Sequence, residues 1–135
     1  MKTLLTLLLL IPSLSWSAEQ RINLLCEYSH TLDFSDGKTT PTSGSASLTV
    51  DLYESDNGVR ISTIDSSEAN CISVGGYNDK TISGSCEKDF GDGVIIQVDI
   101  EIDRYSGEYS ESFILKDKGG GLIHFGKCRV ASKKF

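Results

Sequence analysis

Four cysteines carry the most defined chemistry in this chain of 135 residues: Cys26, Cys71, Cys86 and Cys128. They allow three pairings, and none of them lies in the Cys-x-x-Cys motif of thioredoxin-like redox enzymes. Zinc needs clustered thiolate or imidazole ligands, whereas the chain has only two histidines. We therefore favour two structural disulfides, a local Cys71–Cys86 bond and a long-range Cys26–Cys128 bond, and expect no metal or cofactor.

Acidic residues form a second group whose spacing permits chemistry. Asp99, Glu101 and Asp103 alternate along one segment, and paired carboxylates perform acid–base catalysis in glycosidases. That reaction needs a substrate cleft and one carboxyl group with a raised pKa. The alternate positions of residues 94–102 form an unbroken apolar stripe, which predicts that the three carboxylates face solvent instead.

Nucleophilic catalysis finds little support in the sequence. The chain contains no Gly-x-Ser-x-Gly nucleophile motif. Its two histidines, His30 and His124, lie at the end of one predicted strand and within another, and we expect both at the surface. We predict no catalytic residues and a protein that is not an enzyme.

Residues 33–37 and 89–93 share the pattern Asp-Phe-x-Asp-Gly. Carboxylates three residues apart before a glycine could supply oxygen ligands to calcium, although the spacing is not that of an EF-hand. The same pattern is typical of Asp-Gly turns whose phenylalanines pack on the end of a sheet. We favour the turns, and calcium binding stays an open alternative.

Period-two alternation dominates the elements that would position these residues, and no segment has a convincing helical period. Residues 30–46 contain Ser-Asp-Gly, a proline and Ser-Gly-Ser, which predict a loop. In the segment 109–115, Tyr109, Phe113 and Leu115 continue one apolar face, and Glu111 interrupts it. Strands are predicted over residues 22–28, 48–52, 59–63, 71–77, 80–86, 94–102, 109–115 and 122–130.

About eight short strands separated by turn signals predict an all-β fold, namely a small antiparallel β-barrel stapled by disulfides. A β-sandwich is the alternative. Closure into a barrel removes the unpaired strand edges that promote aggregation. A Cys26–Cys128 bond between the first and last strands fits such closure.

Residues 1–17 have the layout of a secretory signal peptide: a lysine, a short apolar run, a proline and then small residues. We expect cleavage after Ser17 or Ala18, which leaves residues 18–135 as a single β domain. The apolar run is shorter than the ~20 residues that cross a bilayer, so we expect no membrane anchor in the mature chain. The predicted location is the periplasm or the cell exterior.

The balance of charge limits the class of partner. The chain has 13 Lys and Arg against 19 Asp and Glu, a net charge of −6. Nucleic acids select basic surfaces, so we expect no nucleic-acid partner. An acidic surface is compatible with a basic protein partner, although solubility alone also explains it.

The most distinctive segment is a turn with the sequence Arg-Tyr-Ser-Gly-Glu-Tyr. We take it as a candidate binding loop, formed by Arg104, Tyr105, Ser106, Gly107, Glu108 and Tyr109. Together with Gly-Lys-Cys at residues 126–128 and the basic end of the chain, it resembles small uncharacterised exported proteins of proteobacteria. That resemblance implies no activity.

The Ser-Gly-Glu-Tyr stretch, with one cysteine in the first strand and another in the last, also resembles the periplasmic C-type lysozyme inhibitors. This resemblance implies a small acidic barrel that inserts a Ser-Gly loop into the lysozyme cleft. A plain hairpin turn with cross-strand tyrosines remains an alternative. We therefore expect an exported, non-enzymatic binding or inhibitor-type domain, of which lysozyme is one candidate partner. A lipocalin-like barrel around a small apolar ligand, or an envelope protein of another kind, is the alternative.

Overall fold

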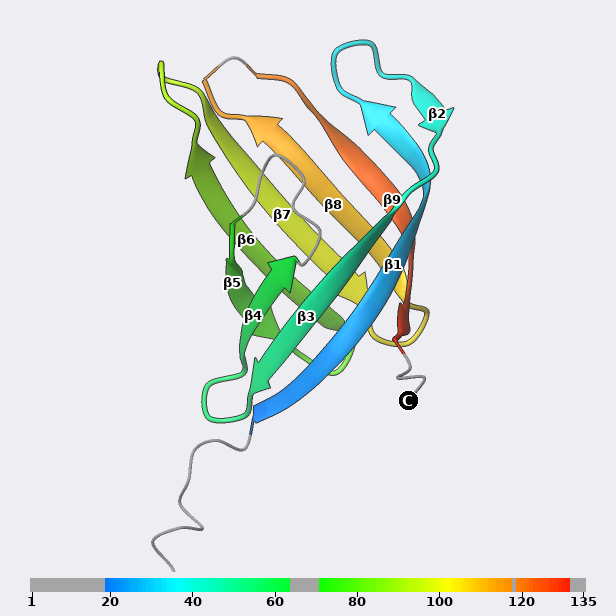
Figure 1. Cartoon of the computed structure of the whole chain (residues 1–135), viewed down its shortest axis with the longest axis vertical. Helices are drawn as coiled ribbons and strands as arrows, with labels where there is room; N and C mark the ends of the chain where they lie inside the picture. Colours follow the sequence, from blue (N-terminus) through cyan, green and yellow to red (C-terminus); the bar gives the residue numbers. More distant parts are fainter. Residues whose placement is uncertain (1–18, 64–70, 118, 132–135) are drawn as a thin grey trace, which may run out of the picture.

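The computed structural model describes residues 19–63, 71–117 and 119–131, in which the backbone forms nine strands (Figure 1). The predicted signal peptide lies outside the described residues. Within the described ranges, no helix could cross a membrane. The strands are β1 (Glu19–Asp33), β2 (Thr39–Pro41), β3 (Ser45–Tyr53), β4 (Gly58–Thr63), β5 (Ser73–Tyr77), β6 (Thr81–Asp89), β7 (Ile95–Asp103), β8 (Glu108–Leu115) and β9 (Gly121–Val130).

Eight of these strands close into an antiparallel barrel, and β2 is added outside the ring. From β3 to β9 each strand pairs with the next one in the sequence, and β1 pairs with both β3 and β9. The prediction of an antiparallel barrel of about eight strands is therefore confirmed. Each of these eight strands is therefore paired with a neighbour on both sides.

The first strand holds the ring together because its two halves have different partners. Residues 19–27 of β1 pair with β3, and residues 24–33 pair with β9. The register with β9 shifts between Tyr28 and His30, which marks a β-bulge. The predicted loop over residues 30–46 is thus wrong in part, because β1 continues to Asp33 and Thr39–Pro41 pairs with it as β2. An edge strand tolerates the proline that argued for a loop.

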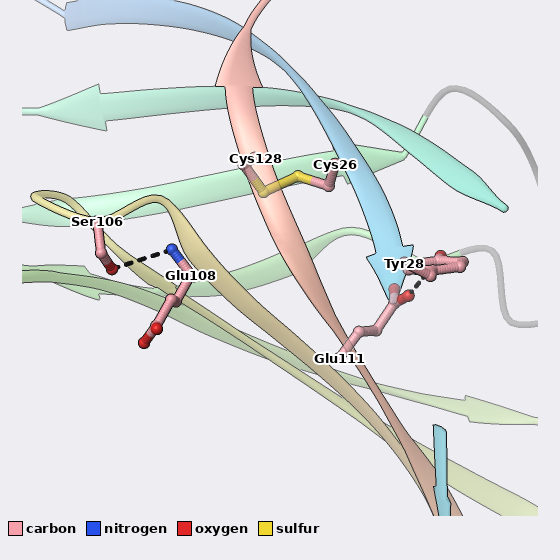
Figure 2. The surroundings of a disulfide bond; sticks show 6 residues. All are labelled: Cys26, Tyr28, Ser106, Glu108, Glu111 and Cys128. Atoms are coloured by element: carbon pink, nitrogen blue, oxygen red, sulfur yellow. Dashed lines mark hydrogen bonds between the residues drawn. A yellow bond between two sulfur atoms is a disulfide. The ribbon is translucent and has the colours of Figure 1, made fainter. Parts of the chain in front are cut away.

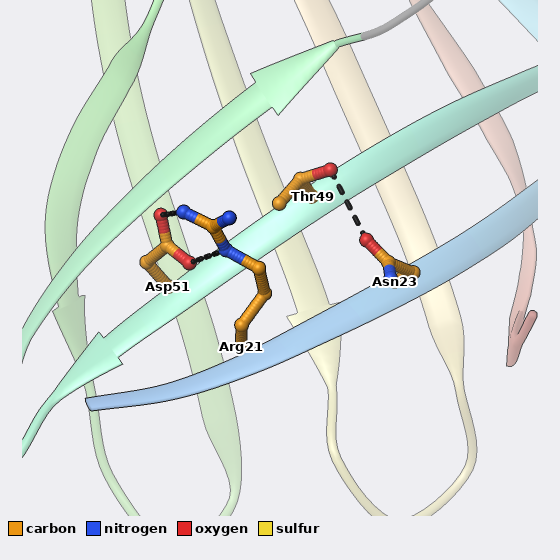
Figure 3. Close-up of polar contacts among 4 residues, drawn as sticks. All are labelled: Arg21, Asn23, Thr49 and Asp51. Carbon is orange, nitrogen blue, oxygen red and sulfur yellow. Dashed lines mark hydrogen bonds and ion pairs between the residues drawn. The ribbon is translucent and has the colours of Figure 1, made fainter. Parts of the chain in front are cut away.

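Polar contacts on the outer surface join the first half of β1 to β3 (Figure 3). Arg21 donates to both carboxylate oxygens of Asp51, over 2.7 Å from Nε and 3.2 Å from Nη2. The Thr49 hydroxyl donates to the side-chain oxygen of Asn23 over 3.2 Å. Both pairs are direct neighbours in the β1–β3 register, so they reinforce the pairing that starts the barrel.

Alternation along the strands separates the barrel core from its surface. Val98, Ile100 and Ile102 of β7 are buried, whereas Glu101 between them is exposed and Asp99 is half-buried on the outer face. The outward orientation predicted for these carboxylates is confirmed. The buried apolar core consists of Leu24, Cys26, Ala46, Leu48, Val50, Leu52, Val59, Ile61, Ile82, Val98, Ile100, Ile102 and Tyr109.

Both predicted disulfides are present. Cys26 is bonded to Cys128 across the β1–β9 pairing, and Cys71 is bonded to Cys86. The first bond joins residues 102 positions apart and locks the seam where the barrel closes. The second closes a local loop of 15 positions next to β5 and β6.

The two ends of the barrel differ in their connections. We call the end with the β3–β4, β5–β6 and β7–β8 connections the turn end, and the opposite end the loop end (Figure 1). At the loop end, the Asp33 and Asp89 carboxylates accept hydrogen bonds from the backbone nitrogens two residues ahead, both over 2.8 Å. These aspartates thus shape turns, and Phe34 and Phe90 beside them are each 42% exposed. Among the described residues, no group of three acidic, histidine or cysteine side chains is placed to hold a metal.

Candidate functional site

The wall formed by β8, β9 and β1 carries the largest concentration of functional side chains. Tyr109, Gly126 and Tyr28 lie side by side in one row across these three strands. Tyr109 is buried, so this row faces the barrel interior. Since side chains alternate along a strand, the rows above and below it face outward. The wall therefore has an inner and an outer face that share the same backbone.

A groove of about 710 Å³, which we call the outer groove, crosses the outer face of this wall. Gly126 lines this groove together with its neighbours in the row, Tyr28 and Tyr109. One side is charged, with Glu27, Glu108, Lys127 and Arg129. The Glu27 carboxylate and the Arg129 guanidinium approach to 3.8 Å across the β1–β9 pairing.

The opposite side of the outer groove is aromatic. The rings of His30 and Phe125 stack with their centroids 4.9 Å apart. Ser29, in the bulge of β1, donates a hydrogen bond to the Phe125 carbonyl over 3.2 Å, and its hydroxyl also lies 2.8 Å from the His30 ring. The bulge thus orients the histidine onto the phenylalanine. A groove with one apolar and one charged side suits a ligand of mixed character.

Gly126 allows the strands around the groove to approach one another. A Cβ atom at this position would lie 1.9 Å from the Glu27 carbonyl oxygen and 2.8 Å from its carbon. Both distances are shorter than van der Waals contact, so any side chain here would force β1 and β9 apart. Gly44 makes a looser contact with the Tyr28 ring, since its Cβ would lie 3.2 Å from that ring. Gly126 therefore makes room for the β1 backbone, and Gly44 makes room for the Tyr28 side chain.

The segment Arg104–Gly107 of the candidate binding loop forms a tight turn at the turn end, next to the outer groove. The Asp103 carboxylate accepts hydrogen bonds from the backbone nitrogens of Tyr105 and Ser106, over 2.9 and 3.0 Å. Gly107 adopts a φ of 77°, a conformation that favours glycine, and its nitrogen donates to the Asp103 carbonyl over 2.9 Å. The two hydrogen bonds to the carboxylate hold the pKa of Asp103 below its usual value.

Further contacts fix this turn to the rest of the barrel. The Arg104 guanidinium donates to the Asn78 carbonyl over 2.6 Å and lies over the ring of Tyr77. On the other side, the backbone nitrogen of Cys128 donates to the Gly107 carbonyl over 2.8 Å. The turn thus connects the β5–β6 connection with the last strand.

The structure separates the six residues of the candidate loop. Tyr105 is 79% exposed at the tip of the turn. The Ser106 hydroxyl accepts a hydrogen bond from the Glu108 backbone over 3.1 Å, and the Glu108 side chain lines the outer groove (Figure 2). Tyr109 is only 2% exposed and its side chain faces the interior, although the residue also lines the outer groove.

The inner face of the wall carries a polar cluster that alternation alone did not reveal. Glu111 is 4% exposed and accepts a hydrogen bond from the Tyr28 hydroxyl over 3.2 Å (Figure 2). Tyr28 stacks on His124 with ring centroids 4.7 Å apart, and Tyr109 lies parallel to it at 6.2 Å. The His124 ring also lies 2.7 Å from the Thr31 hydroxyl. We call Tyr28, Tyr109, Glu111 and His124 the inner cluster.

Burial changes the acid–base chemistry of the inner cluster. Removal from water raises the pKa of Glu111, and the hydroxyls of Tyr109 and Tyr28 partly offset this rise. Burial and the negative charge of Glu111 raise the pKa values of both tyrosines. Burial lowers the pKa of His124, which favours its neutral form. Burial therefore favours the neutral forms of these four side chains.

The sequence contains one indication of the inner cluster, but that indication does not show which way Glu111 faces. Glu111 interrupts an apolar stripe, and the structure places it on the same inward face as Tyr109 and Phe113. The expectation of a surface histidine is wrong for His124, which is half-buried and stacked on an inward tyrosine. Whether an isolated polar residue in an apolar stripe faces a core or solvent depends on strand pairing, which alternation does not define.

Comparison with known proteins gives no relative: no family model matches the chain, and neither a curated protein nor a solved structure does so. The resemblance to periplasmic lysozyme inhibitors thus stays a prediction from sequence. Because one barrel architecture serves many unrelated functions, function must be argued from the outer groove, the turn and the inner cluster.

Proposed function

We propose that this protein is an exported, non-enzymatic domain of the periplasm that binds a basic protein, with lysozyme as the leading candidate. The observation that carries the proposal is the exposure of Tyr105 on a turn whose backbone is held on both sides. Tyrosine is enriched among the residues that dominate the energy of protein interfaces. A free tyrosine at 79% exposure is therefore well suited as a central contact.

The rigidity of the turn favours binding because it reduces the entropy lost on association. The carboxylate of Asp103 and the carbonyls of Lys80 and Asn78 accept hydrogen bonds from the turn. Few rotations therefore remain to be frozen apart from those of the Tyr105 side chain. A turn that inserts into a partner gains affinity when little of its conformational entropy is lost on binding.

The outer groove extends the same surface. Glu108 follows the turn directly and lines the groove, so a partner that contacts Tyr105 reaches the charged side of the groove next. The net charge of −6 attracts basic proteins at long range and accelerates their encounter with the domain. The acidic net charge of the chain and the position of Glu108 next to the turn thus both favour a basic protein partner.

Two features support an exported location, namely the disulfides and the predicted signal peptide. Two disulfides indicate a non-reducing environment. The layout of residues 1–17 is that of an export signal, and its short positive start is typical of bacteria. We therefore place the mature domain in the periplasm, where lysozymes attack the cell wall.

A turbidity assay with purified mature protein, residues 18–135, tests this proposal. The wild-type protein should slow the clearing of a bacterial suspension by C-type lysozyme, and Tyr105→Ala should lose most of that effect. Phe90→Ala is the matched control, because it removes an exposed aromatic ring from the opposite end of the barrel. Unchanged lysis at a large molar excess of wild-type protein would exclude lysozyme as the partner. Equal inhibition by wild type and Tyr105→Ala would exclude the turn as the contact.

A further inference from the structure

The carboxylate of Glu111 is buried without a cationic partner. Among the described residues, no salt bridge includes Glu111, and its hydrogen bond comes from the uncharged Tyr28 hydroxyl. Glutamate is almost never fully buried unless it is paired, because an isolated charge in a low-dielectric interior is costly. The ionised form of Glu111 therefore has no counter-ion within the described residues.

The Tyr109 hydroxyl is a second polar group in the same place. The Tyr109 side chain is 2% exposed, and its hydroxyl lies close enough to Glu111 to affect the pKa of that carboxyl, but it makes no hydrogen bond of normal geometry within the described residues. Burial of a hydroxyl without a full hydrogen bond is unfavourable. Glu111 and Tyr109 project from the same face of β8, two residues apart, so one small polar group could interact with both.

Aromatic rings surround this position. Tyr28 stacks on His124, and Phe113 meets the edge of His124 at a centroid distance of 5.7 Å. The faces of aromatic rings attract cations, and aromatic rings around an ammonium group are a common recognition mode. Burial keeps His124 in its neutral form, so this ring does not compete for Glu111 as a cation.

Burial of the inward side chains decreases toward the loop end. Along β8, exposure rises from the buried Tyr109 and Glu111 to the half-buried Phe113. The neighbouring inward residues Ile96 and His124 are also half-buried. Partly exposed apolar side chains therefore lie on the loop-end side of the Glu111 carboxylate.

We propose that the loop end of the barrel interior binds a small organic amine, whose ammonium group pairs with Glu111 and donates to the Tyr109 hydroxyl. The apolar part of the ligand lies against Phe113 and Ile96. The ammonium group gives the Glu111 carboxylate a counter-ion and gives the Tyr109 hydroxyl a hydrogen-bond donor. The aromatic rings favour contact with both the ammonium group and the apolar part of the ligand. This site lies on the opposite face of the wall from the outer groove and does not depend on the function proposed there.

The test uses purified mature protein and the probe 2-phenylethylamine, with 2-phenylethanol and 3-phenylpropanoate as neutral and anionic controls of similar size. Binding is followed by the thermal unfolding midpoint and by tyrosine fluorescence. The amine should raise the midpoint, and the two controls should not. Glu111→Gln should weaken binding of the amine by about tenfold or more, because a charged hydrogen bond is replaced by a neutral one. Glu101→Gln, the same change on the outer face of the barrel, should bind as the wild type does.

Tyr109→Phe removes only the hydroxyl and should weaken binding several-fold, which keeps the proposal testable if Glu111→Gln does not fold. Equal binding of the amine and the alcohol would overturn the role of charge. The whole proposal fails if butylamine, hexylamine, benzylamine and 2-phenylethylamine all leave the midpoint unchanged at millimolar concentration. It fails equally if Glu111→Gln, folded as judged by circular dichroism, binds the amine as tightly as the wild type.

Discussion

Cys26 on β1 and Cys128 on β9 lie directly opposite each other in the seam that closes the barrel, and their sulfur atoms are bonded. Their separation of 102 positions compares with 15 for the Cys71–Cys86 bond. In the chain-entropy model, bonds that close loops of these lengths stabilise a protein by about 5 and about 3 kcal/mol.

We therefore predict that the double variant Cys26→Ala, Cys128→Ala loses more free energy of unfolding than Cys71→Ala, Cys86→Ala, by about 1–2 kcal/mol. Equilibrium unfolding in urea measures both. A larger loss for the local bond would mean that the disulfide at the seam is not the main constraint on the unfolded chain.

Glu111→Gln should stabilise the protein at neutral pH. Burial raises the pKa of Glu111 in the folded state, so folding favours the protonated form. The stability of the wild type is then greatest below the pKa of the unfolded chain and falls as pH rises through the higher folded-state value. Each unit of that rise costs the folded protein about 1.4 kcal/mol at high pH.

The comparison of Glu111→Gln with wild type should therefore show little difference at pH 4 and a clear advantage for the variant at pH 8. Thermal unfolding at both pH values measures it. Glu101→Gln serves as the control, since its side chain is exposed. A variant that is less stable than wild type at pH 8 would show that the ionised carboxylate stabilises the barrel.

Gly126→Ala should strongly destabilise the β1–β9 seam. The added Cβ would lie 1.9 Å from the Glu27 carbonyl oxygen, and both atoms belong to paired strands that cannot move independently. We expect a loss of about 3 kcal/mol or an insoluble product. Gly37→Ala is the control: its φ of 69° disfavours alanine, but no atom lies within 4 Å of the new Cβ, so a loss of about 1 kcal/mol is expected. Similar losses at both positions would argue against the close approach of β1 and β9.

Asp103→Ala should loosen the turn that presents Tyr105 without unfolding the barrel. The variant removes the acceptor of the hydrogen bonds from the backbone nitrogens of Tyr105 and Ser106. Hydrogen exchange at these two amides should become several-fold faster, whereas exchange in β7 should not change. Unchanged exchange at Tyr105 would mean that Gly107 and the contacts of Arg104 suffice to hold the turn.

Much of the barrel could be predicted from alternation, because long apolar stripes define strands well. The stripe over residues 94–102 became β7 (Ile95–Asp103), and the cysteine pairing followed from the positions of the first and last strands. β2 was missed because its three residues are all exposed and carry no stripe. Its existence depends on an open edge of β1 beyond the bulge, which is a property of the assembled sheet.

The inner cluster was harder to predict for a related reason. Glu111 and His124 lie opposite each other on β8 and β9, 13 positions apart in the sequence, and only the register between these strands brings them together. The space around Tyr28 depends on Gly44, which precedes β3 and faces the tyrosine ring, and on Gly126 of β9, which faces the β1 backbone. Local patterns describe one strand at a time and cannot show which side chains share a row.

The pairing of β1 with both β3 and β9 also sets the order in which the chain can fold. β3 follows β1 closely in sequence, so these strands can pair early, but the strand that pairs with β1 on its other side in the ring is β9, the last strand of the barrel. Until β9 is in place, the Cys26 thiol encounters Cys71 and Cys86 and can form a non-native bond with either. Oxidative refolding should therefore pass through scrambled species, and its rate should increase when a thiol–disulfide isomerase is added.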